Sequence, residues 1–313
     1  MLLGSWSNLF TIVEMIDGFK NFKFWYVFSP YFWLVLFFFI PLAIILKISL
    51  SVSEWGMPPY KKLFSLNEAT GSFDLNITFS NYAFIFSDSY YFQSYLNSIS
   101  LAFTSTLICL IIGYPIAFYV AKSKPKIRNL FLVLLVIPFW TSFLLRVYAW
   151  KVLLQGNGLI NNILINLNLI DEPLSMMYNH YSVILGVVYT YLPFMILPLY
   201  GFLVKFDLRL IEASHDLGVR PIKTFFKIIL PLSIPGIIAG SMLVFIPVVG
   251  EFVIPELLGG SDKLYFGKMI FDEFFVNRDW PIASALAMSG ILFLAIPIMV
   301  FQLAYQKYGL KNE

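Results

Sequence analysis

The sequence YVFSPYFWLVLFFFIPLAIIL extends from Tyr26 to Leu46 without a single charged side chain. An α-helix needs about 20 predominantly apolar residues to cross a bilayer core about 30 Å thick. A helix also satisfies its own backbone hydrogen bonds where no water is available to do so. The sequence therefore predicts a membrane-spanning helix over this stretch.

Further long apolar runs follow, and each is predicted to be another membrane-spanning helix. A transmembrane β-barrel would instead show short segments of alternating hydrophobicity, and these runs are continuous. We therefore predict an all-α integral membrane protein with six transmembrane helices in a domain of residues 26–304, flanked by an arm (1–25) and a tail (305–313). The five further spans are Leu96–Ala121, Asn129–Leu145, Tyr181–Val204, Ile234–Ile254 and Ile282–Ala304.

The composition excludes several classes of protein. Apolar residues make up 59% of the 313 residues and charged residues only 12%, against about 25% charged in an ordinary soluble domain. The net charge of +3 comes without a dense basic patch, so no nucleic acid is expected as a partner. With one cysteine, two distant histidines and no phosphate-binding loop, the chain is expected to bind no metal, cofactor or ATP itself and to have no catalytic residue.

The distribution of charge predicts the orientation of the chain. Basic residues concentrate in cytoplasmic segments of membrane proteins. With the N-terminus inside, the inner segments hold 13 basic and 6 acidic residues, and the remainder holds 8 basic and 12 acidic residues. Both termini are therefore predicted to lie in the cytoplasm. Residues 1–25 carry charges within their apolar stretch, which favours an amphipathic arm on the cytoplasmic face over a cleavable signal.

Three external segments follow from this orientation: residues 47–95, 151–180 and 255–281. The second contains Leu159–Ile170, an apolar stretch too short to span, which is predicted to be an interfacial or re-entrant helix.

The segment of residues 205–231, between the fourth and fifth spans, carries the most informative pattern. Residues 208–217 predict a short amphipathic helix with Leu208, Ile211 and Leu217 near one face. Gly218 can adopt a positive φ and end that helix, and Pro221 suits the first turn of a second short helix. The predicted result is a pair of short helices presented to the cytoplasm, which is a shape suited to docking.

This segment resembles the EAA loop of ATP-binding-cassette importer permeases. The family pattern is Glu-Ala-Ala, three residues, Gly, nine residues, and Ile-x-Leu-Pro. Ser214 stands where the pattern has its second Ala, and we expect little consequence because the two side chains are similar in size. The resemblance implies that the loop docks on a separate ATP-hydrolysing subunit. The matching residues are Glu212, Ala213, Ser214, Gly218, Ile228, Leu230 and Pro231.

The resemblance narrows further to the polyamine importer permeases, with putrescine favoured and spermidine or another small solute as the alternative. It is carried by strings such as 138–150 (PFWTSFLLRVYAW) and 247–260 (PVVGEFVIPELLGG). It implies a type I importer permease fold in the bacterial inner membrane and an alternating-access mechanism. The implied partners are a second homologous permease, two ATPase subunits that bind ATP and Mg²⁺, and a periplasmic polyamine-binding protein. A secondary transporter, a channel and an intramembrane enzyme remain the competing interpretations.

A polyamine crossing the membrane needs carboxylates or aromatic faces, because bare ammonium groups in hydrocarbon are costly. Glu251 is the sharpest candidate, since the neighbouring Pro247, Gly250 and Pro255 favour an interrupted helix whose freed backbone lines a cavity. Glu251 could instead lie beyond the end of the helix or pair with Arg146, a cation that would repel the substrate. Aromatic candidates could equally be an interfacial belt. The full set of path candidates is Glu251, Glu256, Trp140, Tyr148, Trp150, Tyr189 and Tyr191.

Overall fold

The computed structural model describes residues 28–66, 73–207, 209–260 and 263–309, so the predicted arm of residues 1–25 lies outside the described part. Helices dominate these ranges, and two three-residue strands complete the secondary structure found in them. The elements in chain order are η1 (Val35–Phe39), α2 (Ile40–Ser49), β1 (Phe64–Leu66), β2 (Phe73–Leu75), α3 (Ser80–Ser87), α4 (Ser89–Lys122), α5 (Pro125–Val136), η2 (Ile137–Trp140), α6 (Phe143–Leu154), α7 (Leu159–Asn166), α8 (His180–Leu203), α9 (Arg209–Asp216), α10 (Pro221–Thr224), η3 (Phe225–Ile229), α11 (Leu230–Val249), α12 (Val253–Leu258), α13 (Phe266–Phe271), η4 (Asp272–Val276) and α14 (Trp280–Gly309).

The predicted spans correspond to long apolar helices. Within the described ranges, five continuous helices are long and apolar enough to cross a membrane, and a sixth crossing is formed if one bent pair counts as a single span. This confirms the prediction of a helical membrane protein, and the predicted number of six spans is reached when the bent pair is counted as one span. The five continuous helices are Phe28–Ser49, Ser89–Lys122, His180–Leu203, Pro221–Val249 and Trp280–Gln306.

The third predicted span, residues 129–145, differs from the expectation of one continuous helix. Pro125–Trp140 and Phe143–Asn166 are bent by 90° relative to each other. Thr141 adopts an extended backbone (φ −90°, ψ 150°), and its hydroxyl donates to the carbonyl of Pro138 at 2.7 Å. A proline has no N–H and clashes with the preceding helical turn, so the helix tightens into η2 and breaks there.

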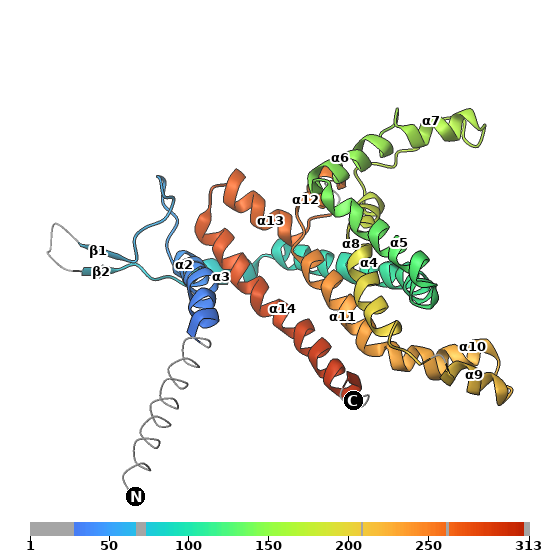
Figure 1. Cartoon of the computed structure of the whole chain (residues 1–313). Helices are drawn as coiled ribbons and strands as arrows, with labels where there is room; N and C mark the ends of the chain where they lie inside the picture. The colour runs from blue at the N-terminus through green and yellow to red at the C-terminus, as the bar shows by residue number, and fades with distance from the viewer. Residues whose placement is uncertain (1–27, 67–72, 208, 261–262, 310–313) are drawn as a thin grey trace, which may run out of the picture.

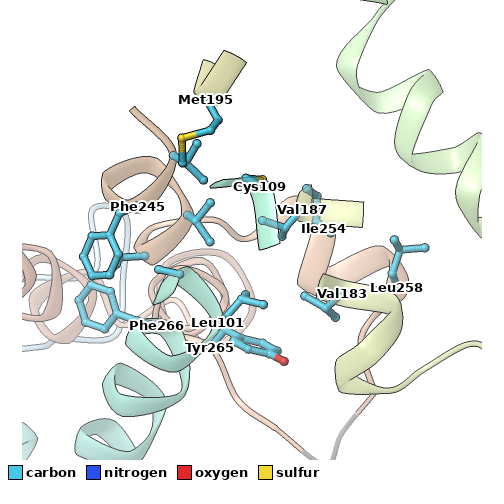
Figure 2. Close-up of a cluster of buried hydrophobic side chains, with 14 of the residues drawn as sticks. Leu101, Cys109, Val183, Val187, Met195, Phe245, Ile254, Leu258, Tyr265 and Phe266 are labelled. Atoms are coloured by element: carbon cyan, nitrogen blue, oxygen red, sulfur yellow. The ribbon is translucent and has the colours of Figure 1, made fainter. Parts of the chain in front are cut away.

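The core is formed where α4, α8 and α11 pack against one another (Figure 1). Small residues allow the close approach: a Cβ on Gly113 would lie 3.2 Å from the side chains of Met195 and Ile196, and one on Gly240 would lie 2.8 Å from the sulfur of Met195. Met195 lies among fully buried aliphatic side chains such as Val187 (Figure 2). The three helices α4, α8 and α11 therefore form the closely packed core of the described chain.

The first external segment is fastened to the bundle by a buried amide. Asn81 on α3 donates to the carbonyls of Ser49 and Ser51, both at 2.9 Å, so the exit from α2 is fixed against α3. Beyond it, β1 and β2 pair antiparallel with Phe64 opposite Leu75, and they lie away from the helices (Figure 1).

The second external segment contains the short helix that was predicted. The structure ends this helix, α7, at Asn166, four residues before the predicted limit, and Asn168 takes a left-handed φ of 55°. Asparagine tolerates this conformation better than most residues, and so it ends the helix.

Candidate functional site

Residues 205–231 form two short helices, as predicted. We call α9, the turn at Gly218, α10 and η3 the elbow. It lies at one end of the helical bundle, beyond α8 and α11 (Figure 1). Gly218 has φ +73°, and its N–H donates to the carbonyl of His215 at 2.8 Å. A left-handed residue ending a helix is the role for which glycine is favoured.

The predicted apolar face of α9 is only partly correct. Ile211 is half-buried, whereas Leu217 is 83% exposed, and Leu208 lies outside the described residues. Glu212 and Ala213 are also exposed. The elbow therefore exposes apolar, acidic and basic side chains together, the basic ones being Arg209, Arg220, Lys223 and Lys227.

Ser214 does more in the structure than its similarity in size to alanine suggested. Its hydroxyl donates to the carbonyl of Ile211 at 2.8 Å and lies 2.9 Å from the hydroxyl of Thr224. Ser214 is 4% exposed and Thr224 1% exposed, so the two hydroxyls form a buried bridge between α9 and α10. The sequence signal was two hydroxyl residues on either side of Gly218, which only the geometry of the turn brings together.

The elbow continues into the core through η3, a π-helix. The ring of Phe225 packs edge-to-face on Tyr114 of α4, with centroids 5.4 Å apart. Tyr114 in turn forms a 2.9 Å hydrogen bond with the Ser233 hydroxyl of α11, and both residues are buried. Single-turn π-helical segments occur often at functional sites. Ile228 and Leu230 are half-buried in this stretch, and Pro231 is exposed at the start of α11.

Glu251 lies in a break between α11 and α12, at the interruption expected from the flanking glycine and prolines. It is 9% exposed. Its Oε2 accepts a hydrogen bond from the Tyr191 hydroxyl at 2.7 Å, and its Oε1 accepts one from the Val253 N–H at 2.9 Å. The carboxylate thus accepts a hydrogen bond from the first residue of α12 and another from Tyr191 of α8, so it links the two helices.

Packing holds this break in place. A Cβ on Gly267 of α13 would lie 2.3 Å from the carbonyl oxygen of Gly250, so the backbones touch. On the far side, a Cβ on Gly186 of α8 would lie 2.6 Å from Leu258 of α12. The break at Glu251 is therefore packed closely against α13, and the helix α12 that follows it is packed closely against α8.

The alternative of an ion pair between Glu251 and Arg146 is wrong. In the described chain the one salt bridge joins Lys268 to Glu256, which is 45% exposed. Glu251 is thus a buried carboxylate with hydrogen-bond donors but no cation within 4 Å among the described residues. No cluster of three metal-binding side chains occurs in those ranges either.

The aromatic candidates divide into separate groups. Tyr191 joins Glu251, whereas Trp150 packs edge-to-face on Tyr189 with centroids 5.4 Å apart. Tyr189 and Tyr191 are two residues apart, a rotation of about 200° around the helix axis, so their side chains lie on nearly opposite faces of α8. Tyr148 is 48% exposed and Trp140 is 85% exposed, and neither joins Glu251.

Residues 113–308 match the family model described as the binding-protein-dependent transport system inner membrane component. The chain belongs to this family. The matched range contains the elbow, Glu251 and the core helices. The chain is therefore an inner membrane component of a transport system, which agrees with the resemblance inferred from residues 212–231.

Curated relatives refine this placement. The chain is 40% identical over 281 residues to the spermidine/putrescine transport system permease protein PotB of Haemophilus influenzae, covering 90% of this chain and 93% of the relative. It is 37% identical to the Escherichia coli protein of the same name, covering 90% and 97%.

A solved structure shows the same fold. A bacterial transporter involved in the import of the acidic polysaccharide alginate superimposes with a TM-score of 0.67 at 14% identity, covering 95% of this chain and 100% of that chain. This confirms the predicted type I importer permease fold for the family member described here.

Proposed function

We propose that this family member is the membrane-spanning permease subunit of an ATP-binding-cassette importer for polyamines, with putrescine as the favoured substrate and spermidine as the alternative. The observation that carries the proposal is the identity of 37–40% over 90% of the chain to permeases named for spermidine and putrescine transport. The protein would carry no ATPase activity of its own, and ATP with Mg²⁺ would bind to a partner subunit.

Glu251 is the proposed contact for a substrate ammonium group. A carboxylate buried in a membrane protein is expensive and is retained mainly for function. Tyr191 and the Val253 N–H each donate a hydrogen bond to it, yet no described cation lies within 4 Å of it. A passing ammonium would supply that countercharge. Trp150 and Tyr189 remain predicted path residues, as do Trp140, Tyr148 and Glu256.

The elbow is the proposed docking point for the ATPase subunit. Its exposed Glu212 and Leu217 would contact that partner, and Phe225 and Tyr114 would pass its movement to α4. The excess of basic residues on the elbow side supports cytoplasmic termini. The complete importer would contain a second homologous permease, two ATPase subunits and a periplasmic polyamine-binding protein, and it would operate by alternating access.

Replacing Glu251 with Gln tests the substrate assignment in the reconstituted importer. We expect polyamine uptake to fall by about tenfold, as for the loss of one charge-assisted contact, while the assembled complex is recovered in normal yield. Glu172→Gln is the matched control, because Glu172 is exposed and lies outside the candidate path. Unchanged uptake in Glu251→Gln would remove it from the path, and uptake without any ATPase would favour a secondary transporter.

A further inference from the structure

Arg146 on α6 lines a hollow of about 420 Å³ together with Trp150 and Tyr189. The other lining residues are Thr141, Leu145, Ala149 and Leu153, so the arginine is the one charged group among those lining it. A cation here repels a polyamine, which separates this hollow from the proposed contact at Glu251.

The guanidinium is held in position but is not neutralised. Its Cζ lies 5.3 Å from the ring centroid of Phe139 and 6.0 Å from that of Phe143. Its Nε is buried without a hydrogen-bond partner, and no carboxylate within the described ranges lies in ion-pairing distance of it. A buried, unsatisfied charged donor is a costly feature unless another group completes it.

Neighbouring contacts give the depth of the hollow along α8. Trp150 packs on Tyr189, and Phe139, the ring beneath Arg146, packs on Phe194 with centroids 5.2 Å apart. Tyr189 and Phe194 follow His180, the first residue of α8, by nine and fourteen positions, which corresponds to about 13 and 21 Å at 1.5 Å per residue. The whole helix spans about 36 Å on the same basis. Arg146 therefore lies level with the middle third of α8, one of the candidate membrane-spanning helices, and so away from the two ends where lipid phosphates would lie.

We infer that Arg146 receives a carboxylate from a second permease subunit, so that an intersubunit ion pair completes this hollow. The inference rests on the proposed function only in requiring a second permease, and it is independent of the substrate. Charge complementarity selects an acidic partner, and the depth selects a protein side chain over a headgroup. Arginine suits this role because its planar group binds a carboxylate through two hydrogen bonds.

The experiment is purification of the complete importer through a tag on this chain. Arg146→Gln is expected to lower the recovery of the second permease by about tenfold or more, since a buried partner charge is left unpaired. Lys151→Gln, a neutralisation on the same helix α6, is the matched control and should leave recovery unchanged. Equal recovery for Arg146→Gln and wild type would overturn the inference.

A charge swap keeps the test valid if Arg146→Gln folds poorly. Arg146→Glu is combined in turn with an arginine at each acidic position in the spans of the second permease, and exactly one combination is expected to restore recovery. If none does, or if Arg146→Gln loses bound phospholipid rather than the second permease, the inference is wrong. Failure to recover any second permease with the wild-type chain would also overturn it. A wild-type importer that assembles with its second permease but takes up no polyamine would overturn the proposed function alone.

Discussion

The bridge between Ser214 and Thr224 gives the most quantitative prediction for the elbow. In Ser214→Ala, the 2.9 Å contact between the hydroxyls is lost and the buried Thr224 hydroxyl keeps only a 3.4 Å contact with the carbonyl of Arg220. A buried group left without a good partner costs about 1–3 kcal/mol. In Thr224→Val, the Ser214 hydroxyl keeps its 2.8 Å bond to Ile211, so the expected cost is about 0.5–1.5 kcal/mol, the net value of one hydrogen bond.

Amide hydrogen exchange, measured in the assembled importer, reports the free energy of opening of the elbow at individual N–H groups. The Val219 N–H donates to the carbonyl of Ser214 at 3.0 Å, so opening of the elbow exposes it. A loss of about 1 kcal/mol should speed its exchange about fivefold. Ser123→Ala is the matched control, because the Ser123 hydroxyl bonds only the carbonyl of Tyr119 among the described residues.

The double variant Ser214→Ala with Thr224→Val decides whether the two hydroxyls act as one unit. The cost of the double change should be smaller than the sum of the single costs by about 1 kcal/mol, because the bridge can be lost only once. Additive effects, or normal exchange in Ser214→Ala, would refute the reasoning. The same variants should hydrolyse more ATP for each polyamine transported if the elbow couples the two activities.

Three further outcomes are expected. Gly218→Val forces a branched side chain into φ +73°, at a cost of about 1–2 kcal/mol, and should reduce uptake while membrane insertion measured by fractionation stays normal; full uptake would contradict the docking role. Gly186→Leu should lower the thermal unfolding midpoint by displacing Leu258, whereas Gly201→Ala, which meets nothing within 4 Å, should not; equal midpoints would refute the packing argument. Burial raises the pKa of Asp272 above its ordinary 3.8, so the native state keeps this proton to higher pH than the unfolded state, and stability falls as pH rises from 3.8 through the raised pKa. Asp272→Asn should flatten this fall when the free energy of unfolding is measured against pH, and an unchanged slope would show that Asp272 is not its source.

The spans were predictable because hydrophobicity over about 20 residues is a local property of the sequence. The break at Thr141 was not, because a proline such as Pro138 can either kink a membrane helix or be absorbed by it. The turn at Gly218 was predicted correctly from a local glycine signal. The bridge from Ser214 to Thr224 was missed because it depends on how that turn folds back.

The candidate path shows the same division between local and distant information. The helix interruption at Glu251 could be inferred from its neighbours, but its bond to Tyr191 joins residues 60 positions apart. The pairing of Glu256 with Lys268 and the grouping of Trp150 with Arg146 also depend on packing between separate helices. Residue types therefore identified candidates, and only the fold separated them into distinct groups.

The positions of the elbow and Glu251 suggest how the two sites would communicate. Span α8 leads into the elbow and α11 leads out of it, while the Glu251–Tyr191 bond joins α8 to the break that follows α11. Because Met195 and Gly240 hold these helices in close contact between the two sites, we expect a change in their angle at the elbow to reach the break at Glu251. We expect closure of the ATPase subunits to alter the distance between Glu251 and Tyr191. A permease in which that distance stays constant through the ATP cycle would require another route of coupling.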